Sequence, residues 1–461
     1  MFKATKKITL CTMVMAVSFA ANAQKKWTLR ECVDYAVEHN LTIEQAELDL
    51  KTTELDRKDA IGNFVPSLNG SASLRFNKGL TQNYVSGSNQ VAEKTIANFT
   101  TGLNSSITLF DGLRNFNTLN RAKLNILATK FNVEDIKDDI RLSVANAYLQ
   151  VLAARETMRT LQAQYNISQK DLEKTKILVE NGSSPKGDVL EVEATLANQE
   201  QQIVDAENNM LIAKIGLAQL LQITDYENFE IADNDYMVPP SDILSHSADE
   251  IYNKAVTFRN DIKYADANVD VAKMDLKIAN GAKLPSLTFG INYNTAYSNG
   301  TTIVGYSGDE GNLQPVYGTI PFKDQLWQND GIYYGFSLNV PILNGFSARN
   351  NSERSKINVQ RSELQLEQAK LALQSDVNKA YTDVKGKLKA FQAAQKNVDA
   401  RRVAYDYSKE RYNVGLLNGF EYSQSQLRLD DAEANLIKAK YDYIFSLKVL
   451  EFYFGIPLDE L

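Results

Sequence analysis

Residues 140–165 read IRLSVANAYLQVLAARETMRTLQAQY, and their apolar residues recur at alternating intervals of four and three. The positions are Ile140, Val144, Ala147, Val151, Ala154, Met158, Leu161 and Tyr165. Such a seven-residue repeat is typical of helices that wind around each other in a left-handed coiled coil. The pattern predicts an uninterrupted helix over about 113–180, roughly 100 Å long at 1.5 Å per residue. No globular core needs a helix of that length.

The long helix has a counterpart later in the chain. Phe110-Asp111-Gly112 aligns with Leu343-Asn344-Gly345, and the same offset continues without a gap to Ile223 and Ile456. Upstream, Pro66-Ser67-Leu68 aligns with Pro285-Ser286-Leu287 at a shorter offset, so the second copy has additional residues between its two β segments. The mature chain therefore reads as two structural repeats, residues 24–240 and 241–461.

Each repeat is expected to run helix, strand, loop, strand, long helix, turn, helix. The first repeat should open with a helix from about Thr28 to Ile61, whose first amphipathic stretch ends at His39-Asn40. The patterns then predict strands at about 68–76 and 98–110, and coiled-coil helices at about 113–180 and 188–222. In the second repeat they predict strands at about 287–297 and 331–341, and coiled-coil helices at about 346–413 and 421–454.

The predicted strands alternate apolar residues with small polar residues. In 331–340, for example, Ile332, Tyr334 and Phe336 alternate with Tyr333, Gly335 and Ser337. A soluble sheet would normally carry Lys and Glu on its polar face, but here only Arg75 is charged. Strands of about ten residues with this alternation fit an outer membrane barrel with a wet lumen. The segments between paired strands, roughly 77–97 and 298–330, are then expected to be external loops.

Four strands cannot close a barrel, and an open sheet edge is not tolerated in lipid. Bacterial barrels of this kind begin at about eight strands, so two or three copies of the chain would be required. The chain is therefore expected to form a symmetric oligomer with identical interfaces.

The composition and the first residues limit the function classes. Residues 1–23 have a basic start, an apolar run from Ile8 to Ala20, and Ala21-Asn22-Ala23 at a cleavage position, which predicts a signal peptide. The net charge of −7 argues against nucleic acid as a partner. The mature chain keeps one cysteine, Cys32, and two distant histidines, His39 and His246. We therefore expect no catalytic residues, no metal site and no cofactor.

A twofold repeat of strand pairs and long heptad helices behind a signal peptide resembles the TolC-like outer membrane efflux protein family, over essentially the whole mature chain. The most specific local motif is Tyr412-Asn413-Val414-Gly415-Leu416, with Val179-Glu180-Asn181-Gly182-Ser183 at the equivalent turn of the first repeat. The resemblance implies a mixed α and β fold. Three chains would form a twelve-stranded β-barrel, with four strands per chain, continued by a long α-helical barrel.

The same resemblance implies a function and its partners. The chain would be an outer membrane channel that extends into the periplasm, serving as the passive exit duct of a tripartite efflux or type I secretion system. Its partners would be two identical chains, a periplasmic adaptor, an inner-membrane pump and outer membrane lipid. The residues expected to contact the adaptor, at the periplasmic tip, are Asn181, Gly182, Ser183, Val414, Gly415 and Leu416.

Acidic residues stand close to these turns. Asp188, Glu191 and Glu421 would form rings in a threefold assembly, and such rings favour cations. The resemblance implies a latch in which Tyr412 bonds to Asp188 on the neighbouring helix pair. The sequence departs from the family at Leu417, where the best-known members carry a basic latch residue. Read from the residues alone, these side chains are also consistent with solvated surface and helix capping, with Asp188 as an N-cap.

One alternative stays open: a non-channel coiled-coil protein, such as a periplasmic adaptor or a structural protein. An adaptor would carry one helical hairpin flanked by small β-domains, whereas this chain carries two repeated hairpins and alternating strands. The sequence does not name the transported cargo or the adaptor and pump, and does not separate efflux from protein secretion.

Overall fold

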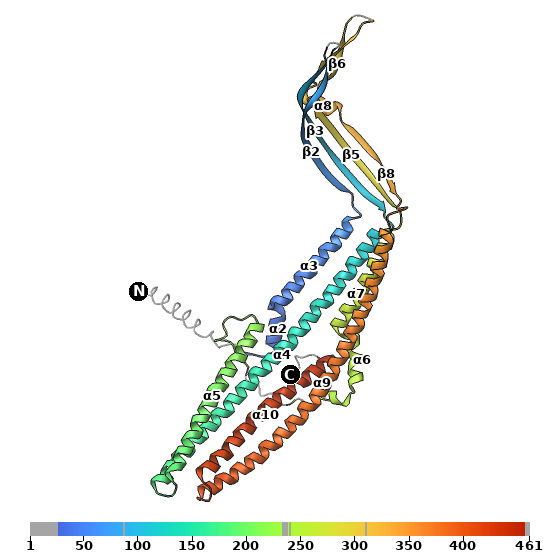
Figure 1. The fold of residues 1–461 in the computed structure, drawn as a ribbon. Helices are drawn as coiled ribbons and strands as arrows, with labels where there is room; N and C mark the ends of the chain where they lie inside the picture. The colour runs from blue at the N-terminus through green and yellow to red at the C-terminus, as the bar shows by residue number, and fades with distance from the viewer. Residues whose placement is uncertain (1–25, 86–87, 233–237, 239–240, 309–310, 457–461) are drawn as a thin grey trace, which may run out of the picture. The chain divides into compact units, whose positions relative to one another are not determined.

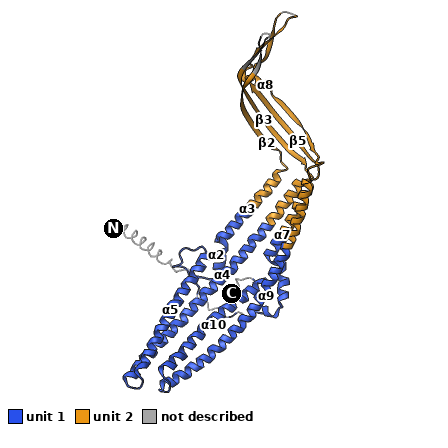
Figure 2. Cartoon of the chain, viewed as in Figure 1, with its two compact units in different colours: residues 1–50, 128–265, 365–461 blue, residues 51–127, 266–364 orange. Residues whose placement is uncertain are grey.

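The structure is a computed structural model that describes residues 26–85, 88–232, 238, 241–308 and 311–456. The predicted signal peptide, residues 1–23, lies outside the described residues. The chain divides into two compact units (Figure 2). Unit 1 comprises 1–50, 128–265 and 365–461, and unit 2 comprises 51–127 and 266–364. Each unit therefore takes segments from both predicted repeats.

Two long helical hairpins dominate the chain (Figure 1). The first is α4 (Arg114–Glu180) with α5 (Lys186–Leu220), and the second is α9 (Ser347–Asn413) with α10 (Gly419–Phe454). The shorter helices are α2 (Leu29–His39), α3 (Leu41–Gly62), α6 (Ala248–Phe258) and α7 (Asn260–Gly281), with a 3-10 turn at Ile243–Ser245. Lys26–Trp27 (β1) and Glu230–Ile231 (β4) form a short parallel pair.

The opening helix, expected to be continuous from Thr28 to Ile61, is broken at Asn40. Asn40 has an extended backbone, and its side chain accepts a hydrogen bond from Thr42 N at 2.9 Å. Its Nδ2 donates to Leu220 O at 3.3 Å. An asparagine side chain that bonds to nearby backbone groups competes with helical hydrogen bonding, which explains the break at the end of the first amphipathic stretch.

A core of unit 1 lies where α4, α5 and α10 meet α2. Val144, Tyr148, Leu217 and Ile444 are each fully buried there. Val144 and Val151 of the predicted heptad are buried, as expected, while Ala154 and Met158 are only partly buried. The buried apolar residues therefore follow the heptad in this part of α4, because one stripe of the helix faces its neighbours.

Unit 2 is built on a four-stranded antiparallel sheet in the order β2-β3-β5-β8 (Figure 1). Its strands are β2 (Ser67–Val85), β3 (Ser88–Phe110), β5 (Ser286–Ser298) and β8 (Gly331–Asn339). The expected strand at 68–76 is therefore too short, and the expected loop at 77–97 is wrong. The β2–β3 pairing continues from Ser67↔Ser106 to Val85↔Ser88, so backbone hydrogen bonding extends the hairpin well past the alternating segment.

The apolar side chains of the sheet are exposed in the single chain. Leu74, Phe76, Tyr334 and Phe336 are 57%, 65%, 76% and 71% exposed. The outer edges of β2 and β8 have no partner strand among the described residues. A sheet with open edges and bare apolar side chains is not a finished structure in water.

The segment expected to be the second external loop, 298–330, contains regular structure. It holds a small hairpin of β6 (Thr302–Ser307) and β7 (Gln314–Gly318), followed by α8 (Phe322–Gln328). None of the described helices has an apolar stretch of the length and hydropathy needed to cross a membrane. The mixed α and β fold class expected from the sequence is confirmed.

Candidate functional site

The two hairpin turns of unit 1 have the same backbone geometry. In the first turn, Ser183 N donates to Leu178 O at 2.8 Å, and in the second, Leu416 N donates to Arg411 O at 2.8 Å. Gly182 and Gly415 occupy the left-handed region, with φ of 71° and 76°. This is the Schellman ending of a helix, in which a glycine takes the left-handed position without steric cost. The predicted adaptor-contact residues therefore sit in two matching turns.

The two turns differ in the chemistry that they expose. Val414 and Leu416 are 69% and 70% exposed in the second turn. Asn181 and Ser183, at the matching places in the first turn, are exposed and polar. The second turn therefore presents aliphatic side chains to solvent, whereas the first presents polar ones.

Tyr412 and Asp188 lie at the place where the two hairpins meet, but they do not bond to each other. The Tyr412 hydroxyl lies 3.0 Å from Thr175 Oγ1 on α4. Asp188 Oδ1 accepts a hydrogen bond from Gly419 N, the first residue of α10, at 3.2 Å. The expected Tyr412–Asp188 bond is replaced by two separate bonds, and each of them still joins one hairpin to the other.

The expected N-cap role of Asp188 is also different in the structure. The N-cap of α5 is Pro185, and Asp188 lies one turn in from it. Its carboxylate instead satisfies the N-terminus of α10, where negative charge is favoured by the helix dipole. A Cβ at Gly419 would lie 3.0 Å from Asp188 Oδ1, so glycine permits this close approach.

Glu191 and Glu421 stay near solvent. Glu191 is half-buried and Glu421 is exposed. Neither carboxylate forms an ion pair with a described residue, and Glu421 contributes its N–H to the Asn418 cap of α10 at 2.8 Å. Both carboxylates therefore lie at or near the surface of the hairpins. Leu417, at the place of the family's basic residue, packs against the cluster of Tyr405, Tyr412, Tyr422 and Leu429.

Sequence reasoning missed a row of buried polar residues on α4. The row consists of Gln164, Ser168, Asp171 and Thr175, at spacings of four, three and four. These positions continue the heptad of Leu161 with polar side chains, whereas the predicted heptad counts only apolar residues and ends at Tyr165. Polar residues at heptad spacing beyond Leu161 are the signal that identifies them.

Each residue of this row bonds to the second hairpin. Tyr422 Oη donates to Asp171 Oδ2 at 2.5 Å, and Gln426 Nε2 donates to Ser168 Oγ at 2.6 Å. Gln164 Nε2 donates to Glu433 Oε2 at 2.7 Å. On α5, Gln199 Nε2 donates to Asp430 Oδ2 at 2.8 Å. We call these bonds, together with those of Thr175–Tyr412 and Asp188–Gly419, the polar seam between the hairpins.

Burial changes the acid–base properties of the polar seam. It raises the pKa of the Tyr405, Tyr412 and Tyr422 hydroxyls above the usual value of about 10, so all three stay protonated and can donate. Burial also raises the pKa of Asp430 to about 7, partly opposed by the hydrogen bond from Gln199. The polar seam therefore consists of neutral donors around carboxylates, one of which titrates near neutral pH.

The arrangement holds two helical hairpins together by hydrogen bonds that can be exchanged for water. Within the described residues, no group of three or more His, Cys, Asp or Glu side chains is placed to hold a metal ion. Each of these bonds is individually modest in strength.

Comparison with known proteins gives the family. The family described as outer membrane efflux protein matches residues 32–221 and 251–455. The outer membrane protein TolC of Vibrio cholerae is 24% identical over 306 residues, 66% of this chain and 65% of that protein. The pyoverdine export outer membrane protein OpmQ of Pseudomonas putida is 23% identical over 354 residues, 75% of this chain and 68% of that protein. The matched region thus spans just under two thirds of the length of that TolC protein.

A solved structure shares the fold. The outer membrane channel CmeC of Campylobacter jejuni superposes with a TM-score of 0.75 at 18% identity, covering 94% of this chain and 87% of that one. That family is one of efflux proteins rather than of enzymes. Since the family match extends over both long hairpins and most of the chain, this protein belongs to the outer membrane efflux protein family and lies in the bacterial outer membrane.

Proposed function

We propose that the chain is one subunit of a passive conduit across the outer membrane and the periplasm, the exit duct of a tripartite efflux or type I secretion system. It would perform no covalent chemistry, and an inner-membrane pump would supply the energy. The observation that carries the proposal is the unfinished four-stranded sheet, with apolar side chains on one face, small polar ones on the other, and two open edges.

The open edges support a trimer. Each copy contributes four strands, and three copies would close a twelve-stranded barrel in which every backbone group finds a partner. The edge of β8 in one chain would pair with the edge of β2 in the next, which is a head-to-tail contact that closes by rotation. The apolar faces would then meet lipid, and the polar faces would line a wet lumen. The long helices would continue the wall as an α-helical barrel.

The hairpin turns are the proposed contact for a periplasmic adaptor. Val414 and Leu416 supply exposed aliphatic side chains, and Asn181 and Ser183 supply polar ones. Gly182 and Gly415 hold both turns in the same shape. Two turns of matching backbone and different side chains would offer a repeating surface around a ring.

The constriction is proposed where the hairpins meet. Asp188, Glu191 and Glu421 would supply negative charge near the mouth, which favours cations. Tyr412 and Asp188 each join the hairpins through their own partner. Opening would break the polar seam and let water replace its hydrogen bonds. Such a change needs an adaptor that binds the open arrangement more tightly than the closed one.

Conductance of the purified protein in planar bilayers tests the proposal. We expect a channel whose open current rises when the polar seam is weakened by Tyr412→Phe or Asp188→Ala. Tyr407→Phe is a matched control, because Tyr407 is exposed on the same helix. Absence of any current in the wild type and in both seam variants would contradict the conduit.

Site-directed cross-linking tests the adaptor contact. A photo-reactive residue at Val414 or Leu416 should capture an adaptor in intact cells that also contain the pump. The same residue at Val403, exposed on α9 but away from the turn, should not. Equal capture from all three positions would exclude the turns as the specific contact.

A further inference from the structure

The described part of the polar face of the sheet carries positive charge and no negative charge. In the register of the sheet, Arg75 lies opposite Asn98, and Lys94 lies opposite Gly79 on the same face. Among the described residues of that face, from Ser67 to Gly79 and across β3, β5 and β8, there is no Asp or Glu. Lys94 enters the sheet only because β3 begins earlier than the sequence pattern indicates.

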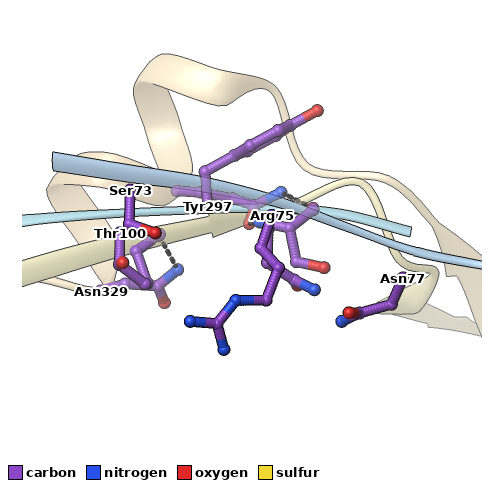
Figure 3. A pocket seen from close by; sticks show the side chains of 10 residues that line it. Ser73, Arg75, Asn77, Thr100, Tyr297 and Asn329 are labelled. Atoms are coloured by element: carbon purple, nitrogen blue, oxygen red, sulfur yellow. Dashed lines mark hydrogen bonds between the residues drawn. The ribbon is translucent and has the colours of Figure 1, made fainter.

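Arg75 stands in a hollow of about 430 Å³ on this face (Figure 3). The rows Ser73–Thr100–Ala296 and Arg75–Asn98–Ser298 form its floor. Asn77, Gln325 and Asn329 complete the lining. The short side chain of Ala296 leaves room in the middle of the floor. A hollow of this volume lies within the roughly 300–1,000 Å³ range of small-molecule sites.

One wall of the hollow is built by α8, which runs beside the end of β5. Gln325 is buried, and its side chain bonds to the Ser298 backbone as a neighbouring strand would. Its Oε1 accepts from Ser298 N at 2.9 Å, and its Nε2 donates to Ser298 O at 2.8 Å. Asn329 Nδ2 donates to Ala296 O at 2.8 Å, and Thr295 Oγ1 donates to Leu326 O at 2.7 Å. These bonds hold α8 and Asn329 against the end of β5.

The guanidinium of Arg75 is left without an anionic partner. It forms no ion pair or hydrogen bond with any described residue, and Figure 3 shows it pointing away from the strands into open space. Tyr297, by contrast, points to the opposite side of the sheet in the same view. The groups around Arg75 are amides and hydroxyls, which can both donate and accept hydrogen bonds.

We propose that this hollow, here called the Arg75 pocket, is a binding subsite for small organic anions that carry a carboxylate or phosphate group on a hydroxyl-bearing body. The planar fork of the guanidinium matches the two oxygens of such a group. Asn77, Asn98 and Thr100 bond to the neutral polar body. In the proposed trimer three such pockets face the lumen, so this part of the proposal rests on the proposed function.

Direct binding tests the pocket without requiring transport. The purified, detergent-solubilised full chain is titrated with citrate in a calorimeter, with glucose as an uncharged hydroxylated control. We expect saturable citrate binding, no glucose binding, and at least about a tenfold loss of affinity in Arg75→Gln, because a charge-assisted pair is removed. Asn98→Ala should weaken binding by a smaller factor while keeping the charge.

Lys94→Gln is the matched control, because it removes the same charge from the same face outside the pocket. The proposed Arg75 pocket is contradicted if Arg75→Gln binds citrate like the wild type. It is also contradicted if Lys94→Gln loses as much affinity as Arg75→Gln. Planar bilayers provide the second measurement: citrate should reduce the current saturably in the wild type and Lys94→Gln, and not in Arg75→Gln. A protein that conducts but never binds citrate overturns the pocket alone, whereas one that binds citrate without ever conducting overturns the conduit.

Discussion

The two units of the chain differ in which side chains they bury and which they expose. In unit 1, polar side chains such as Asp171, Gln199 and Asp430 are buried, and each has a hydrogen-bond partner in the same chain. In unit 2, large apolar side chains such as Tyr334 and Phe336 are exposed, and no described residue covers them. A single copy therefore forms the polar seam of unit 1 but leaves the apolar face of the unit 2 sheet exposed.

The difference shows which part of the molecule depends on its surroundings. Exposed apolar area in unit 2 is stable only against lipid or another chain. The polar seam of unit 1 has the reverse property, since its bonds could be exchanged for water at modest cost. The sheet of unit 2 therefore needs lipid or a neighbouring chain.

The largest expected effect comes from charging the apolar face of the sheet. Phe336→Arg should destabilise the assembled sheet by about 2–4 kcal/mol, the cost of a cation on the lipid face of a barrel. Ser337→Arg places the same charge on the opposite face and should be tolerated. The measurement is the fraction of heat-modifiable trimer in the outer membrane. Equal loss in both variants would remove the distinction between the two faces.

The next effect concerns the polar seam. Tyr422→Phe removes the hydroxyl that donates to the Asp171 carboxylate and contacts the Tyr405 hydroxyl 3.0 Å away. Hydrogen bonds to charged groups contribute about 1.5–3 kcal/mol, and we expect a loss of that size in the free energy of unfolding of the helices. Tyr407→Phe, on an exposed tyrosine, should change little. Denaturant unfolding followed by helical circular dichroism decides between them.

A smaller effect should appear as a pH dependence. The pKa of Asp430 is about 7 in the folded chain against 3.8 ordinarily, so between these values the folded state holds a proton that the unfolded state has released. Stability should therefore fall as pH rises from about 4 to 7. Asp430→Asn should flatten this slope in unfolding experiments at several pH values. Asp249→Asn, an exposed aspartate on α6 of the same unit, should leave the slope unchanged.

Part of the dependence of stability on pH should remain in Asp430→Asn. Burial and the neighbouring Asp261 raise the pKa of Asp135, also in unit 1, to about 6. Its contribution has the same sign and ends about one pH unit earlier. A wild-type chain whose stability rises over this window would contradict the burial of both carboxyls.

The smallest effect tests the hairpin turns. Gly415→Ala forces a side chain into the left-handed region, which costs about 1 kcal/mol. Gly386→Ala, inside α9 with open space around it, should instead stabilise by about 0.5–1 kcal/mol. Thermal unfolding should give a lower Tm for Gly415→Ala and a higher Tm for Gly386→Ala. Shifts in the same direction would mean that the turn glycine is not held in the left-handed conformation.

The sequence predicted the long helices well and the contacts between them poorly. The ends of α4, α5, α9 and α10 lie within two residues of the expected positions, because the heptads are long and the turns carry glycine. Which face of α4 is buried near its end depends on helix rotation, and one residue turns the helix by about 100°. A heptad that counts only apolar residues leaves a buried polar residue such as Asp171 out of the predicted contact.

The sheet was predicted from its alternating segments but not in its full extent. Residues 77–97 are rich in Gly, Ser and Asn, so side-chain pattern does not distinguish strand from loop there. The pairing of β2 with β3 is set by backbone hydrogen bonds that the hairpin continues once it has begun. Gln325 bonds to a backbone 27 residues away, which no local pattern encodes.

The two open edges of the four-stranded sheet have a genetic consequence. If each chain must pair with a neighbour on both sides, one subunit with a defective edge strand prevents the barrel from closing, even when the other subunits are normal. A cell that makes equal amounts of normal and edge-defective chains would then hold only about one sound trimer in eight. Mutations on β2 or β8 should therefore be dominant over the normal allele, while mutations that only weaken a hairpin turn should be recessive.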